Sequence, residues 1–178
     1  MTQIDHFLSL DNRVAIITGA ATGLGAATAQ LLSQAGARVV INHIPGQETQ
    51  AQAVAKDCPN DSLCYAADIT NDKECQAMAQ AAIQQWGQID ILINNASAIN
   101  LTRTDQTPAK RFDLMFDVNV RGTFLTSQAA LPHLRKSAAE GRNPHILNLS
   151  PPLSMKPIWF KNHVAYTMAK YGMSMCVL

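Results

Sequence analysis

The chain has 178 residues, which is enough for one domain with a hydrophobic core. Apolar residues make up 47% of it and charged residues 15%, a balance typical of globular proteins rather than disordered ones. The formal net charge is +1 and no run of Lys and Arg forms a basic patch, so a nucleic-acid partner is not indicated.

The predicted elements follow one another as alternating short apolar runs and helix-like stretches. In chain order they are a strand at 14–17, a helix at 23–35, a strand at 38–41, a helix at 47–56, a strand at 62–66, a helix from a cap at Asn71 or Asp72 to Trp86, a strand at 89–93, a helix at 111–136, a strand at 145–149, and a helix that starts near His163 and still runs at Leu178. The longest helix carries Phe112, Met115, Phe116, Val120 and Phe124 at helical spacing.

This alternation of strands and helices predicts an α/β fold. Continuous apolar strands are typical of a parallel sheet that is covered on both faces. Right-handed crossovers then give a doubly wound parallel sheet, the Rossmann fold. Residues 1–178 contain no internal repeat or linker, so we expect one domain.

The cysteines and the start of the chain bear on location. Cys58, Cys64, Cys75 and Cys176 form no C-x-x-C pair, so neither a metal site nor a disulfide framework is indicated, and reduced thiols are expected. Residues 1–12 lack the basic start and apolar stretch of a signal peptide. No apolar run approaches the roughly 20 residues that span a bilayer. We therefore expect a soluble, cytoplasmic protein without a membrane partner.

A glycine-rich turn joins the first strand to the first helix. Residues 18–25 read T-G-A-A-T-G-L-G. Glycines let the backbone approach a pyrophosphate and adopt conformations that cost other residues energy, and a helix N-terminus offers free N–H groups to anions. The spacing therefore favours a dinucleotide site, although such glycines can also be purely structural. The candidate cofactor-binding residues here are Gly19, Thr22, Gly23, Leu24 and Gly25.

The T-G-x-x-x-G-x-G spacing resembles that of the short-chain dehydrogenase/reductase family, and four more family motifs follow in order. Asp68-Ile69 stands where the family's Asp contacts adenine, and 94–97, N-N-A-S, is similar to N-N-A-G. Asn119 lies in D-V-N-V-R-G, which resembles N-V-x-G, and 166–170 matches Y-x-x-x-K. Each motif alone has a structural explanation, but together they favour the family. The resemblance implies cofactor contacts from Asp68, Ile69, Asn95, Ala96, Ser97, Tyr166 and Lys170.

Residues 150–152 and 166–175 are similar to the hydroxysteroid dehydrogenase-like branch of the family. Tyr166 and Lys170 are four residues apart, so they share one face of a helix. A nearby ammonium lowers the pKa of a phenol, which suits Tyr166 to general acid/base chemistry. The resemblance implies hydride transfer between NAD(P) and a carbonyl/alcohol substrate. It also implies that Lys170 holds the nicotinamide ribose and that Asn119 helps to position a water.

The catalytic serine is where the sequence departs from the family. The family's serine lies thirteen residues before the tyrosine, and that position here is Leu153. Alignment on the preceding strand places it instead on Pro151. Ser150 and Ser154 remain as candidates for the hydroxyl that binds the developing oxyanion, with Ser150 slightly preferred.

The choice of cofactor is the second open point. In relatives that prefer NAD an acidic residue ends the second strand and holds the ribose 2′-OH. Here that place is taken by Asn42-His43. The lack of a carboxylate favours NADP slightly over NAD, with His43 as a partial partner for a 2′-phosphate. The alternative, a His43 that faces solvent, remains equally open.

The end of the chain is the third departure. Family members continue into two more strands with a substrate-binding loop, whereas this sequence stops at Leu178. We therefore expect a domain that is incomplete at its C-terminus, truncated after the fifth strand and part of the next helix. The family's subunit interface suggests a homo-oligomer in the full-length form. A non-catalytic nucleotide-binding fragment is the alternative function, while the lack of G-x-x-x-x-G-K-[ST] disfavours a P-loop protein.

Overall fold

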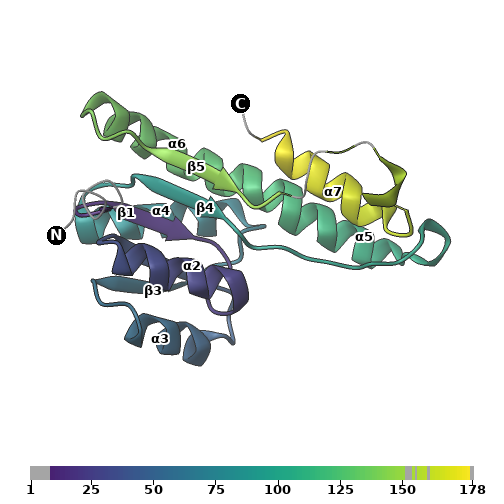
Figure 1. Ribbon diagram of the computed structural model, residues 1–178, viewed down its shortest axis with the longest axis horizontal. Coiled ribbons are helices and arrows are strands. Elements are labelled where there is room, and N and C mark those ends of the chain that lie inside the picture. The colour runs from purple at the N-terminus through teal and green to yellow at the C-terminus, as the bar shows by residue number, and fades with distance from the viewer. Residues whose placement is uncertain (1–8, 151–153, 155, 160, 177–178) are drawn as a thin grey trace.

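The computed structural model describes residues 9–150, 154, 156–159 and 161–176 (Figure 1). At its centre is a five-stranded sheet with the order β3-β2-β1-β4-β5, in which every neighbouring pair is parallel. The strands are β1 (Val14–Ile17), β2 (Arg38–His43), β3 (Ser62–Ala66), β4 (Ile91–Asn94) and β5 (His145–Asn148). The order reverses between β1 and β4, which is where ligands bind in open α/β sheets.

Helices cover both faces of this sheet (Figure 1). One face is covered by α2 (Gly23–Gln34) and α3 (Glu48–Lys56), and the other by α4 (Asp72–Trp86) and α6 (Thr123–Ala139). The remaining helices, α5 (Ala109–Phe116) and α7 (Val164–Ser174), pack against each other. Short turns of 3-10 helix, η1 (Thr104–Gln106) and η3 (Pro157–Trp159), precede α5 and α7, and a π-helical segment, η2 (Asp117–Gly122), joins α5 to α6. The predicted doubly wound Rossmann-like fold is confirmed.

The side chains of β1 explain why the sheet needs two covers. All four residues of this strand are buried. Val14 and Ile16 pack with α4 and α6, whereas Ala15 and Ile17 pack with α2 and α3, because successive side chains of a strand point to opposite faces. Each fully buried Ile or Val contributes about 1.5–3 kcal/mol relative to exposure. The apolar run therefore holds both layers together.

Most predicted boundaries agree with the structure to within one to three residues. Asn71 is confirmed as the N-cap of α4, because its side chain accepts hydrogen bonds from the backbone N–H groups of Lys73 and Glu74. The prediction that the last helix continues to the end of the chain is wrong, since α7 ends at Ser174. The amide of Cys176 turns back to the carbonyl of Met173, a tighter turn than an α-helix, and residues 177–178 lie outside the described residues.

The long predicted helix is also interrupted. It spans 109–139 as α5, η2 and α6, and the π-helical segment holds one more residue per turn than an α-helix. Phe124 is consequently 54% exposed and does not join Phe112, Phe116 and Val120, which pack around Met115 beneath α7. Figure 1 shows α5 and α7 side by side.

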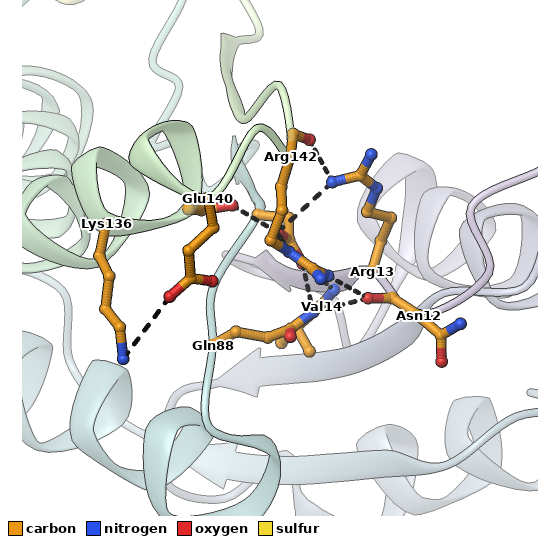
Figure 2. A network of polar contacts seen from close by, with 9 residues as sticks. Asn12, Arg13, Val14, Gln88, Lys136, Glu140 and Arg142 are labelled. Atoms are coloured by element: carbon orange, nitrogen blue, oxygen red, sulfur yellow. Dashed lines mark hydrogen bonds and ion pairs between the residues drawn. The ribbon is translucent and has the colours of Figure 1, made fainter.

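A buried carboxylate, Asp90, fixes the amino-terminal edge of the sheet, and Figure 2 shows Val14, Gln88 and Arg142, three of the residues that bond to it. Its oxygens accept hydrogen bonds from Val14 N at 2.9 Å, Ser137 Oγ at 2.6 Å, Gln88 Nε2 at 2.8 Å and Arg142 Nε at 2.8 Å. One side chain therefore joins β1, α6 and the segment that leads into β5.

Within the described ranges, none of the helices is both long and apolar enough to cross a bilayer. Among the described residues β5 pairs only with β4, and Ile146 and Leu147 on it are partly exposed.

Candidate active site

A cavity of about 470 Å³ opens at the carboxyl-terminal edge of the sheet, among the segments that follow β1, β2, β3 and β4. The structure brings nine of the predicted cofactor residues together in its wall: Gly19, Thr22, Leu24, Asn42, Asp68, Ile69, Asn95, Ala96 and Ser97. Five lining residues were not predicted: Ile44, Gln47, Ala67, Ala98 and Val118. Of these, Val118 lies inside the motif around Asn119, and Ile44, Ala67 and Ala98 each stand directly beside a predicted residue or motif, whereas Gln47 had no such signal.

The glycine-rich turn has the geometry of an anion cradle. Gly19 and Gly23 have φ angles of +62° and +59°, in the left-handed region that favours glycine. A Cβ on Gly25 would lie 2.5 Å from the carbonyl oxygen of Gly19, so the helix approaches the turn closely. Thr22 makes no side-chain capping bond to α2, and the first turn holds no acidic residue. Its N–H groups and positive dipole end therefore suit the phosphates of a dinucleotide.

Two asparagines hold the Gly19 peptide from opposite sides. Asn42 Oδ1 accepts a hydrogen bond from Gly19 N at 3.1 Å, while its Nδ2 donates to Ala67 O at 3.1 Å. Asn95 Nδ2 donates to Gly19 O at 3.1 Å and to Thr18 O at 2.9 Å. The Thr18 hydroxyl, which sequence reasoning missed, accepts from Asn95 N at 3.0 Å. These bonds fix the turn before any ligand binds.

His43 does not line the cavity, and the alternative that it faces solvent is wrong. The residue is 3% exposed, and its Nδ1 lies 3.0 Å from the carbonyl oxygen of Ile44. Side chains alternate along a strand, so Asn42 and Ile44 reach the cavity while His43 points to the other face. The wall beyond β2 is therefore formed by the uncharged residues Asn42, Ile44 and Gln47.

Asp68 and Ile69 form the cavity wall after β3. Asp68 Oδ1 accepts hydrogen bonds from Thr70 N at 2.9 Å and from Thr70 Oγ1 at 2.8 Å, which closes a local turn. Ile69 is buried against Gly122, where a Cβ would lie 2.6 Å from Ile69 Cδ1. Asp68 is thus a turn residue and a cavity residue at once.

Asn119 lies in the π-helical segment and is fully buried. Its Oδ1 accepts hydrogen bonds from Ser97 Oγ at 2.8 Å and Ala98 N at 3.2 Å, and its Nδ2 donates to Ala98 O at 2.7 Å. The side chain therefore fastens the segment after β4 to η2. Segments of π-helix occur frequently at functional sites. The sequence indicated Asn119 but not the π-helical turn that presents it.

Tyr166 and Lys170 lie on α7, one helical turn apart. Lys170 is 5% exposed, and its Nζ donates to Leu149 O at 2.9 Å. Burial lowers the pKa of Lys170 below its ordinary value. The Tyr166 hydroxyl has no hydrogen-bond partner among the described residues, and its ring packs in the same cluster as Ala98 of the cavity wall. Neither Tyr166 nor Lys170 is among the residues that line the cavity, and Tyr166 is linked to its wall only through the cluster that contains Ala98.

The two candidate serines have different surroundings. Ser150 Oγ contacts Ser174 Oγ, and Ser174 Oγ donates to the backbone oxygen of Lys170 at 3.0 Å. The backbone oxygen of Ser154 instead accepts a hydrogen bond from the Tyr171 hydroxyl at 2.6 Å. Leu153 and Pro151, the positions given by family spacing, lie outside the described residues. The preference for Ser150 over Ser154 stays a prediction.

Three features define a Rossmann-like α/β protein. The strand order of the parallel sheet reverses between β1 and β4, a glycine-rich turn precedes a helix N-terminus without a side-chain cap, and a cavity lies at the carboxyl ends of the strands. A model of the short chain dehydrogenase family matches residues 13–177, and the chain belongs to this family of NAD(P)-dependent oxidoreductases.

Curated relatives carry the name hydroxysteroid dehydrogenase-like protein 2. The protein from Danio rerio is 51% identical over 170 residues, and that from Bos taurus is 46% identical over 170 residues. Each match covers 91% of this chain and 40% of the relative, so the chain spans about two-fifths of their length.

Solved structures agree with this fold. A short chain dehydrogenase from Mycobacterium thermoresistibile superposes with a TM-score of 0.84 at 38% identity, over 94% of this chain and 61% of its own. A double mutant of a Serratia marcescens short-chain dehydrogenase/reductase gives a TM-score of 0.81 at 27% identity, over 92% and 65% respectively.

Proposed function

We propose that this chain transfers hydride between NAD(P) and a carbonyl/alcohol substrate, with Tyr166 as the general acid/base. One observation carries the proposal: Tyr166 lies with its hydroxyl unpaired among the described residues, one helical turn from the buried Lys170 and in the same cluster as Ala98 of the cavity wall. Nucleotide binding alone does not require a Tyr-Lys pair of this kind, so the arrangement favours an enzyme over a non-catalytic module.

Two parts of the cavity wall would hold the phosphates and the adenine of the cofactor. The free N–H groups at the start of α2 suit the pyrophosphate, and Asp68 and Ile69 suit the adenine side. When bound, the cofactor supplies or accepts the hydride. NADP is preferred slightly over NAD in this proposal, because Asn42, Ile44 and Gln47 place no carboxylate where a ribose 2′-OH would be recognised.

The proton moves through this chain's own residues. In reduction the carbonyl carbon receives the hydride, and Tyr166 gives its phenolic proton to the carbonyl oxygen; oxidation reverses both steps. Lys170 lies one helical turn from Tyr166, and one of its three N–H groups is used by Leu149 O. Asn119 holds the segment after β4 against η2, and Ser150 is the preferred donor to the oxyanion.

The proposal extends to the setting of the reaction. Residues 1–178 act as one NAD(P)-binding domain in the cytoplasm, as a homo-oligomer in the full-length form. Neither nucleic acid nor membrane is a partner. The name shared by the curated relatives makes keto- and hydroxysteroids the first substrates to test.

Fluorescence titration of the purified chain with NADPH, and then with NADH, tests cofactor binding. We expect saturation with both, tighter for NADPH. A keto-steroid is then added, and Tyr166→Phe is expected to slow cofactor oxidation about 10²–10⁴-fold without weakening cofactor binding, because the general acid is lost. A folded chain that binds neither nucleotide overturns the proposal. Cofactor binding without turnover of any carbonyl or alcohol would favour the non-catalytic alternative.

A further inference from the structure

Ser97 lines the cavity and differs in type from the residue that the family pattern has at this position. It takes the place of the glycine in the N-N-A-G motif that residues 94–97 resemble. The residue is exposed and lines the cavity, while its Oγ donates to Asn119 Oδ1 at 2.8 Å. A glycine at this position would offer the cavity no hydroxyl at all.

The direction of this hydrogen bond follows from the atoms around Asn119. Ala98 fixes the orientation of the Asn119 amide from two sides, because its N–H approaches Oδ1 at 3.2 Å and its carbonyl oxygen approaches Nδ2 at 2.7 Å. The atom that faces Ser97 is therefore the acceptor Oδ1. The single hydroxyl proton of Ser97 is therefore donated to Asn119 Oδ1. The Ser97 oxygen can then act toward a ligand only as a hydrogen-bond acceptor.

The two ends of the cavity then have opposite hydrogen-bonding character. The start of α2 offers unpaired N–H donors, which suit phosphate oxygens. The Ser97 oxygen is an acceptor, and it suits a hydroxyl or an amide N–H group instead. A phosphate group, whose oxygens are acceptors, would be repelled by it.

The acceptor end of the cavity is also the end beside the catalytic helix. Ala98, the next residue after Ser97, packs in one cluster with Tyr166, Met115 and Ala165. Asn119, the partner of Ser97, belongs to η2, which contacts α7. A group that bonds to Ser97 is therefore held close to the Tyr166 side of the site.

We propose that Ser97 Oγ accepts a hydrogen bond from a hydroxyl or carboxamide N–H group in the nicotinamide-ribose half of the cofactor. This inference rests on the proposed function. The bond would place the reacting ring beside Tyr166, and the rigid contact to Asn119 would keep the Ser97 oxygen turned as an acceptor.

Affinities for NADPH and for ADP, measured by titration of the wild-type chain and of Ser97→Ala, test the proposal. Loss of one neutral hydrogen bond is expected to weaken NADPH about 3- to 10-fold. ADP lacks the nicotinamide half, so its affinity is expected to stay unchanged. Ser62→Ala, a serine on β3 that does not line the cavity, is the matched control and should bind both ligands like the wild type.

Three other results would overturn the inference. If Ser97→Ala binds NADPH as tightly as the wild type, the hydroxyl makes no such bond. If NADPH and ADP weaken equally, Ser97 supports the cavity as a whole rather than its nicotinamide end. If the folded wild-type chain binds ADP but neither dinucleotide, the proposed function has failed first, and the inference falls with it.

Discussion

Polar side chains at the amino-terminal edge of the sheet bond to one another, whereas at the carboxyl-terminal edge several of them end in a cavity. Asp90 uses both oxygens on protein donors, and in Figure 2 Arg142 and Arg13 converge on this network. At the opposite edge the first N–H groups of α2 have no side-chain cap, and the Tyr166 hydroxyl has no partner among the described residues.

This difference separates stability from function within one sheet. A buried charge that is fully paired stabilises one arrangement of β1, β4 and α6 and leaves nothing for a ligand to bind. Unpaired donors beside a cavity cost some stability and are available to a ligand. Substitutions at the two edges should therefore affect different measurements.

The largest effect is expected from Asp90→Ala. This change leaves the Arg142 guanidinium, the Ser137 hydroxyl and the Val14 amide without their partner, and loss of one member of a buried pair costs about 3–5 kcal/mol. Denaturant unfolding measures the change in free energy. Asp105→Ala removes an exposed pair with Arg103 and should cost less than about 1 kcal/mol. Equal losses in the two variants would remove the distinction between the edges.

Acid unfolding of the same variants gives the sign of the Asp90 contribution. Burial raises the pKa of Asp90, but hydrogen bonds from Arg142, Ser137 and Val14 outweigh it, and the pKa lies below its ordinary value. Such a carboxyl stabilises the fold above its unfolded pKa of about 3.9 and loses this contribution as pH falls through the lower folded value. The wild type should therefore lose stability below about pH 5 more steeply than Asp90→Ala.

Gly25→Ala is the corresponding change at the carboxyl-terminal edge. The new Cβ would lie 2.5 Å from Gly19 O and from Asn95 Nδ2, so the turn must shift. We expect a stability loss of about 1–3 kcal/mol, reduced by the better helix propensity of alanine, and an NADPH affinity about tenfold weaker or more. Ala27→Ser, at an exposed position of α2, is the control. Unchanged NADPH binding in a destabilised Gly25→Ala would contradict the role given to the turn.

The smallest effect concerns thiol reactivity beside the site. Burial, with neighbouring Asp72, Asp68 and Glu74, raises the pKa of Cys75 to about 12, and its Sγ donates to Ile69 O at 3.2 Å. In the folded chain iodoacetamide should modify Cys75 more slowly than the partly exposed Cys176, because the thiolate is the reactive form. Peptide mapping after timed labelling compares them. Equal rates would indicate that the region around Cys75 opens readily.

The sequence predicted the sheet and the cradle because both depend on local patterns. Apolar runs such as 38–41 are typical of strands that helices cover on both faces. Glycines such as Gly19 indicate a turn whose backbone conformation costs other residues energy. The burial of His43 could not be predicted, because it depends on which face of the sheet the last residues of β2 point to. The contact of Asn119 with Ser97 depends on a π-helical turn, which has no sequence periodicity of its own.

The packing of Gly172 on α7 against Val120 of η2 has a consequence for how the site responds to motion. A Cβ on Gly172 would lie 2.9 Å from Val120 Cγ2, so the backbone of α7 lies directly against the Val120 side chain. The contact packs the helix that carries Tyr166 and Lys170 tightly against the segment that carries Asn119. Thermal motion of the surrounding loops would therefore move the Tyr-Lys pair and the segment of Asn119 together.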